Sequence, residues 1–129
     1  MIYVPGALFS VNPTTVRGVP NLFARNERVV GVFASPEHSP FVVVLVGATI
    51  VGSMATVWNG VVNSKRTNKV IEWTYADRAI ALRKGDEMGR FLLGSTIVML
   101  FLPDTIIFNR NWAPERQGRL GERMGDRPA

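Results

Sequence analysis

A charge-free stretch, residues 39–64, limits what this chain can fold into more than any other feature. Its apolar centre, Phe41–Trp58, approaches the length of a short membrane-spanning helix. Glycine and hydroxyl residues interrupt this centre, however, and the rest is dominated by valine and isoleucine, which favour extended backbone. We therefore expect two short buried strands with a glycine break. The alternative is a small protein with a single membrane span.

Similar short apolar runs follow one another along most of the chain, separated by turn signals rich in proline, glycine and asparagine. Within one of them, Ile71, Trp73 and Tyr75 alternate with polar residues, as in a half-buried strand. No segment shows a long helical period. The pattern predicts an all-β fold, a sandwich or barrel-like domain of short strands. The strands are expected at 2–11, 28–34, 70–75, 79–82, 88–93, 96–102 and 105–108.

The composition of the 129 residues limits the partners of this protein. Hydrophobic residues make up 47%, enough for one domain with a core. The absence of cysteine excludes disulfides and thiolate metal sites. The net charge of +5 suits anionic partners, and charge alone does not distinguish lipid headgroups from nucleic acid. Residues 109–129 hold five arginines and few apolar side chains, so we expect a basic flexible tail there.

The bond between Gly94 and Ser95 stands at the mouth of a predicted buried strand and has the chemistry of a self-cleaving bond. Glycine tolerates unusual backbone conformations, so its carbonyl can turn toward the next hydroxyl. Attack by Ser95 on the Gly94 carbonyl would convert the amide into an ester, and β-elimination would then break the chain. Hydrolysis of the new N-terminus would leave a pyruvoyl group, an electrophilic carbonyl made from the backbone.

The sequence around this bond, Lys84–Phe101, resembles the processing site of phosphatidylserine decarboxylases. Three further blocks also resemble this family and follow in the family's order: Leu8–Asn12, Val19–Val29 and Leu45–Ser53. Gly-Ser-Thr alone would be a weak signal, whereas four ordered blocks covering roughly residues 1–104 are a strong one.

The resemblance implies a function and a division of the chain. Residues 1–108 would form the C-terminal part of the decarboxylase catalytic domain. Self-cleavage would place residues 1–94 in the β subunit and residues 95–129 in the α subunit. The covalent pyruvoyl group made from Ser95 would form a Schiff base with phosphatidylserine and accept the electrons released with CO2, giving phosphatidylethanolamine. Neither a metal nor an external cofactor is expected.

The resemblance also assigns supporting residues. Thr96 is either an ordinary strand residue or a hydroxyl that orients the site. Glu87 either points to water or supports the processing turn. Ser10 is an ordinary strand hydroxyl by its sequence, whereas the family places the corresponding serine in the substrate pocket. The polar cluster Arg25–Arg28 reads as a solvated turn, with contact to an anionic headgroup as the alternative. His38 lies in a proline-bounded loop, and we do not expect it to be catalytic.

The family's histidine motif and catalytic aspartate, which would supply the general base, are absent from this chain. We therefore expect a fragment of a longer proenzyme, incomplete on its N-terminal side and inactive or unprocessed alone. The expected partners are phosphatidylserine and an anionic membrane surface, on the cytoplasmic face of a bacterial inner membrane. Nucleic acid is not expected, and a homodimer is left open. The alternative function is a non-catalytic β-sandwich binding module.

Overall fold

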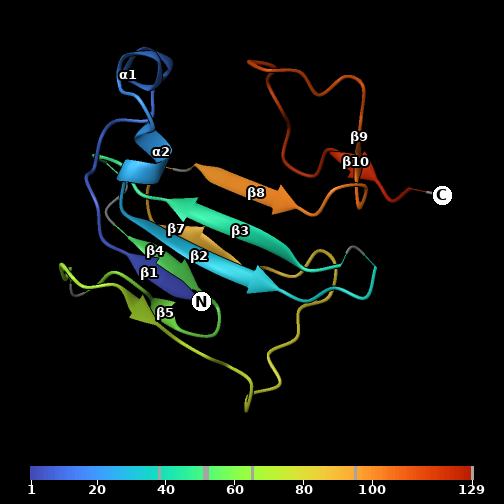
Figure 1. Ribbon diagram of the computed structural model, residues 1–129, viewed down its shortest axis with the longest axis horizontal. Coiled ribbons are helices and arrows are strands. Elements are labelled where there is room, and N and C mark those ends of the chain that lie inside the picture. Colours follow the sequence, from blue (N-terminus) through green and yellow to red (C-terminus); the bar gives the residue numbers. More distant parts are fainter. Residues whose placement is uncertain (38, 51–52, 65, 95, 129) are drawn as a thin grey trace.

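The computed structural model of the chain describes residues 1–37, 39–50, 53–64, 66–94 and 96–128. The largest unit is a five-stranded antiparallel sheet with the strand order β6-β1-β2-β3-β8 (Figure 1). Its strands are β1 Ile2–Val4, β2 Arg28–Phe33, β3 Phe41–Val46, β6 Ile71–Glu72 and β8 Ile97–Phe101.

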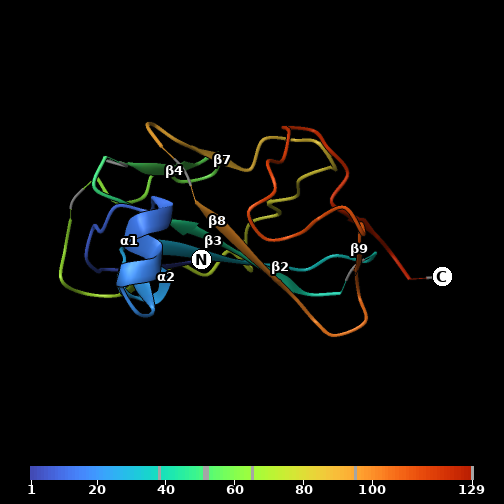
Figure 2. The ribbon, with the colours of Figure 1, turned by 90° about the horizontal axis from the view of Figure 1, so that it is seen from above.

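Two smaller sheets and two short helices complete the described chain. The three-stranded sheet has the order β5-β4-β7, and β10 pairs with β9. Figure 2 shows β4 and β7 as a second layer over the large sheet, with both helices at one end. The bounds are β4 Met54–Thr56, β5 Gly60–Val61, β7 Gly89–Phe91, β9 Ile107–Phe108, β10 Gly125–Asp126, α1 Pro13–Gly18 and α2 Leu22–Arg25.

The hydrophobic core lies between the two layers. The large sheet contributes Tyr3, Val29, Val43 and Leu45, and Met54 faces them from β4 with no exposed surface. Each sheet is therefore apolar on the face that meets the other, which is the arrangement of a β-sandwich.

The β2–β3 hairpin shows how the sequence specifies this arrangement. The two strands pair in register from Arg28 opposite Val46 to Phe33 opposite Phe41. Successive side chains point to opposite faces, so Val29 is 2% exposed whereas Val32 is 63% exposed. Phe33 stacks on Phe41 with ring centroids 5.4 Å apart, which closes the far end of the hairpin.

The charge-free stretch forms strands, as predicted. It contains β3 and β4, and Gly47 lies in the connection between them. Among the residues that the structure describes, no helix is both long and apolar enough to span a bilayer. The all-β prediction is confirmed, with antiparallel sheets of short strands, and the described strands do not close into a barrel.

Three strand predictions need correction. Of the strand expected at 70–75, only Ile71–Glu72 forms a strand, β6. The strand expected at 2–11 ends at Val4, and a helix that was not predicted begins at Pro13. Asn12 caps this helix by accepting a hydrogen bond from the Thr15 N–H at 2.8 Å, so the Asn-Pro pair is a helix start. The strand expected at 79–82 is wrong, because a turn closed by the Ile80 N–H on the Arg78 carbonyl directs the backbone away from sheet pairing.

The C-terminal residues contain more pairing than their composition predicted. Gly125 and Asp126 form β10 against β9, and the Asn109 N–H donates to the Met124 carbonyl at 2.9 Å. The strand was missed because its partner lies 17 to 19 residues away in the sequence. The flexibility of this tail stays a prediction.

Replacing Met54 with alanine should test the core between the sheets. The change removes a fully buried side chain, so we expect the free energy of unfolding to fall by roughly 2–5 kcal/mol in urea titrations. Leu100→Ala is the control, since Leu100 is 55% exposed and its loss should cost about 0.5 kcal/mol or less. Equal losses for both variants would contradict a core between the layers.

Candidate functional site

The predicted cleavage bond lies in the connection that carries the chain from one layer to the other. This connection leaves the small sheet at the end of β7 and enters the large sheet at the start of β8 (Figure 2). Ser95 itself lies outside the described residues, so the site is defined by its neighbours. Gly94 is exposed and has φ +73°, a left-handed conformation that disfavours residues with a Cβ. The backbone conformation at position 94 therefore favours glycine, the residue that the sequence has there.

The backbone is anchored on both sides of this glycine. Before it, the Leu92 N–H donates to the Ser53 carbonyl at 3.1 Å, which extends the pairing of β7 with β4. After it, the Thr96 carbonyl accepts from the Val46 N–H at 2.9 Å, at the junction of β8 with β3. The described residues on the two sides of the bond are thus anchored, one to each of two sheets that pack on each other.

A buried polar cluster lies beside these anchors: Asn26, Glu27 and Asn63, all at most 3% exposed. The Asn26 side-chain amide donates to the Phe9 and Gly47 carbonyls, both at 2.9 Å. The Glu27 carboxylate accepts from the Tyr3 hydroxyl at 2.6 Å and from the Asn63 amide at 3.1 Å. Buried polar groups are stable only when they are hydrogen-bonded in this way.

This cluster corrects the reading of Arg25–Arg28 as a solvated turn. Only its arginines reach solvent, where Arg25 lies over the Phe9 ring at 4.8 Å from its centroid. Asn26 and Glu27 are buried inside the protein. Their side chains bind hydrogen-bond partners that lie up to 36 residues away in the sequence. A sequence window of four polar residues contains no signal for partners at that distance.

The environment of Tyr3 shows how strongly this interior differs from water. Burial, and next the hydrogen bond and negative charge of Glu27, raise the pKa of the Tyr3 phenol to about 12. The neutral phenol is therefore the form that the folded protein stabilises.

The other predicted site residues lie in different surroundings. Thr96 is half-buried and directly precedes β8, and both of its predicted roles stay predictions. The exposed Glu87 binds Arg90 through two hydrogen bonds of 2.7 and 2.9 Å, and this hydrogen bonding raises the pKa of that guanidinium. Ser10 accepts from the Asn12 side-chain amide at 3.0 Å. The supporting roles of Glu87 and Ser10 stay predictions, and His38 lies outside the described residues.

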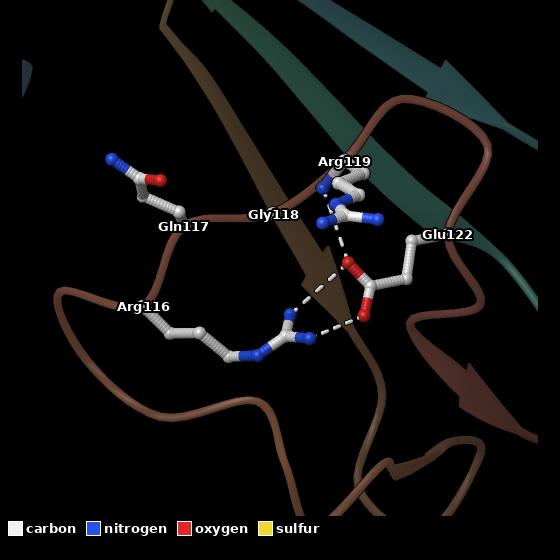
Figure 3. Close-up of a pocket in the computed structure, with 5 residues that line it drawn as sticks. All are labelled: Arg116, Gln117, Gly118, Arg119 and Glu122. Atoms are coloured by element: carbon white, nitrogen blue, oxygen red, sulfur yellow. Dashed lines mark hydrogen bonds and ion pairs between the residues drawn. The ribbon is translucent and has the colours of Figure 1, made fainter.

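A pocket of about 500 Å³ lies in the C-terminal loop, and none of its lining residues belongs to the connection between β7 and β8 (Figure 3). Arg116 faces Glu122 across it in a bidentate ion pair, and Glu122 also accepts from the Arg119 N–H at 3.1 Å. These hydrogen bonds, that of Arg116 first, lower the pKa of Glu122. Glu122 thus neutralises the Arg116 charge, while Arg119 contributes a second guanidinium to the lining.

Comparison with known proteins shows the family of this chain. The family described as phosphatidylserine decarboxylase matches residues 1–126. Over 126 residues the chain is 68% identical to the phosphatidylserine decarboxylase proenzyme of Azoarcus sp. (strain BH72), and the match covers 98% of this chain and 43% of that protein. The proenzyme of Variovorax paradoxus (strain S110) is also 68% identical, over 98% of this chain and 44% of its own length. The chain belongs to the phosphatidylserine decarboxylase family.

Membership of this decarboxylase family confirms the resemblance found in the sequence blocks. The match extends past the roughly 104 residues that those blocks cover and includes most of the basic C-terminal segment. The chain spans less than half the length of these curated relatives. More than half of each relative therefore has no counterpart in this chain.

The raised pKa of Tyr3 predicts a pH dependence of stability. A phenol with a pKa of 10.0 when unfolded and about 12 when folded stabilises the protein fully below pH 10, and this contribution is lost as the pH rises through 12. We expect the free energy of unfolding to fall over that window, more steeply than in Tyr3→Phe. Tyrosinate absorbance, compared between the two proteins, should show Tyr3 ionising near pH 12. Ionisation of Tyr3 near pH 10 would contradict the buried hydrogen bond.

Proposed function

We propose that this chain is the pyruvoyl-forming part of a phosphatidylserine decarboxylase, which converts phosphatidylserine to phosphatidylethanolamine and CO2. The observation that carries the proposal is Gly94, an exposed left-handed glycine held between two anchored strands immediately before a serine. The 68% identity to decarboxylase proenzymes over nearly the whole chain supports it.

The proposed processing reaction uses only atoms of the chain and one water molecule. The Ser95 hydroxyl adds to the Gly94 carbonyl carbon, the amide nitrogen leaves, and an ester forms. Removal of the Cα proton of Ser95 expels the Gly94 carboxylate and leaves a dehydroalanine. Water then replaces its nitrogen, which departs as ammonia, and a keto group remains at the new N-terminus.

The residues beside the bond hold the backbone and do not supply the base. Leu92, Leu93, Gly94 and Thr96 have no side chain that titrates near neutral pH. The proton acceptor must therefore approach from elsewhere. By the family resemblance, it is a histidine backed by an aspartate in the part of the proenzyme that this chain does not match. A missing general base costs a factor on the order of 10²–10⁴ in rate, so the chain alone should cleave slowly or not at all.

The keto group at residue 95 would supply an electrophile that stabilises the negative charge left by departing CO2. The contribution of the described residues is positional: after cleavage the keto group would stay attached to Thr96, whose carbonyl accepts a hydrogen bond from the Val46 N–H. The net charge of +5 suits the anionic headgroup and an anionic bilayer surface. We place the assembled enzyme, two subunits from one proenzyme, on the cytoplasmic side of a bacterial inner membrane.

Processing is best tested in a chimera in which this chain replaces the matching segment of the Azoarcus proenzyme. We expect the chimera to separate into two pieces at Gly94–Ser95, the second lacking a free N-terminal amine, and to release CO2 from phosphatidylserine. Ser95→Ala removes the attacking hydroxyl and should leave one intact chain with no turnover above background. Mass spectrometry and CO2 release are the measurements.

The control for this experiment is Ser64→Ala, which removes an exposed serine hydroxyl outside the proposed site. It should cleave and turn over like the parent chimera. Cleavage or undiminished CO2 release in the Ser95→Ala chimera would overturn the proposal. An intact parent chimera would favour the alternative, a non-catalytic β-sandwich binding module.

A further inference from the structure

The two backbone anchors of the cleavage bond converge on one buried residue, Glu27. We propose that Glu27 is a positioning residue for self-cleavage, which ties the strand end before Gly94 to the strand end after Ser95. This inference rests on the proposed function for its consequence. Its structural part, the tie itself, can be measured independently.

The first connection runs from Glu27 to the strand after the bond. The Glu27 carbonyl accepts from the Gly47 N–H at 2.7 Å, and the Asn26 side chain holds the Gly47 carbonyl from the other side. Gly47 directly follows Val46, whose N–H donates to the Thr96 carbonyl. A Cβ on Gly47 would lie 3.2 Å from the Glu27 carbonyl oxygen, so this close approach favours a glycine. The end of β3, and with it Thr96, is thus clamped by Asn26 and Glu27.

The second connection runs from the same residue to the strand before the bond. Glu27 Oε2 accepts from Asn63 Nδ2 at 3.1 Å, and Asn63 Oδ1 accepts from the Met54 N–H at 3.0 Å. Met54 lies in β4 opposite Phe91, at the point where the Leu92 N–H reaches the Ser53 carbonyl. Asn63 is therefore the link between the buried carboxylate and the strand pair that leads into Gly94.

Burial makes this tie effective. Glu27 is 2% exposed and Asn63 3%, so water cannot readily replace either partner. The hydrogen bond from the amide to the carboxylate is charge-assisted, and the low dielectric of the interior strengthens it further. Intramolecular attack depends steeply on placement, and an error of about 1 Å can cost on the order of 100-fold in rate. A hydrogen-bonded tie that holds the backbone on both sides of the scissile bond would therefore help to place the Ser95 hydroxyl against the Gly94 carbonyl.

The connection between Glu27 and Asn63 can be broken and restored by exchanging donor and acceptor. Asn63→Asp puts two carboxylates in contact and removes the donor, so the tie should open. Adding Glu27→Gln restores one amide-to-carboxylate hydrogen bond in the reverse direction, and the carboxylate introduced at position 63 can still accept from the Met54 N–H. Glu27→Gln alone should keep the tie, because its amide oxygen can accept from Asn63 and its amide nitrogen can donate to the Tyr3 oxygen. It also removes the ion pair of Glu27 Oε1 with the partly exposed Arg66 Nε at 4.0 Å, so a modest loss of stability is expected.

Hydrogen exchange of the chain itself measures the structural part. In Asn63→Asp we expect the Leu92 amide to exchange about tenfold faster or more, while amides in the centre of the β2–β3 hairpin change little. The double variant should return the Leu92 amide to within about threefold of the parent. Uniform acceleration of all amides, or a double variant as fast as Asn63→Asp, would overturn the tie. Val29→Ala is the control for general destabilisation, since it should accelerate core amides without a selective effect on Leu92.

Cleavage in the Azoarcus chimera measures the functional part. We expect Asn63→Asp to slow cleavage by about 10- to 100-fold and the double variant to recover most of it. Faster exchange at Leu92 with an unchanged cleavage rate would overturn the positioning role. If the parent chimera with native residues 27 and 63 does not cleave, the proposed function fails, and the positioning role fails with it. The exchange data would still decide whether the tie exists.

Discussion

The structure depends on a carboxylate that is buried where two sheets meet. The Glu27 carboxylate accepts hydrogen bonds from Tyr3 of the large sheet and from Asn63, which follows β5 of the small sheet. Its backbone carbonyl accepts from the Gly47 N–H. A buried carboxylate that lost these partners would be strongly destabilising, so each partner fixes the position of the others. Apolar packing between Val43, Leu45 and Met54 holds the layers together but is compatible with small sliding movements. The polar contacts are directional, and they set the register between the layers.

The sequence predicted the parts of the fold whose signal is local. β2, β3, β7 and β8 appeared near their predicted positions because apolar runs between turn signals mark strands within a few residues. The strand after the bond, β8, was expected to be buried, but Ile97 is 56% and Leu100 55% exposed because β8 is an edge strand of the large sheet. The Gly94–Ser95 bond was predicted as the cleavage site because a sequence motif marks it. The cluster of Asn26, Glu27 and Asn63 was missed because its burial results from contacts 17 to 36 residues apart. A short polar stretch of sequence predicts solvent exposure. Only the folded chain shows that these buried side chains make hydrogen bonds inside the protein.

The same reasoning explains the errors in strand length. Residues 79–82 have a strand-like composition, but Ile80 and Leu82 are exposed and follow a turn. Conversely, Gly125 and Asp126 have poor strand propensity and still pair with β9, since pairing depends on the partner as much as on the residue. Strand propensity describes a residue that fits a half-buried pleated surface, and the tertiary fold decides whether that surface exists.

The position of the predicted cleavage bond depends on both the local sequence and the tertiary fold. A peptide bond inside a strand is protected by its ladder and planarity, and one in a free loop has no fixed geometry for attack. The connection from β7 to β8 avoids both limits, because its ends are held by Leu92 and Thr96 while Gly94 adopts a left-handed conformation. Its neighbours in the sequence, Leu92, Leu93 and Thr96, carry no side chain that could act as a base. The bond can therefore have a geometry suited to attack and still remain intact. Under the proposed function, reactivity would then require a second component that brings the proton acceptor, and processing would be conditional on assembly of the proenzyme.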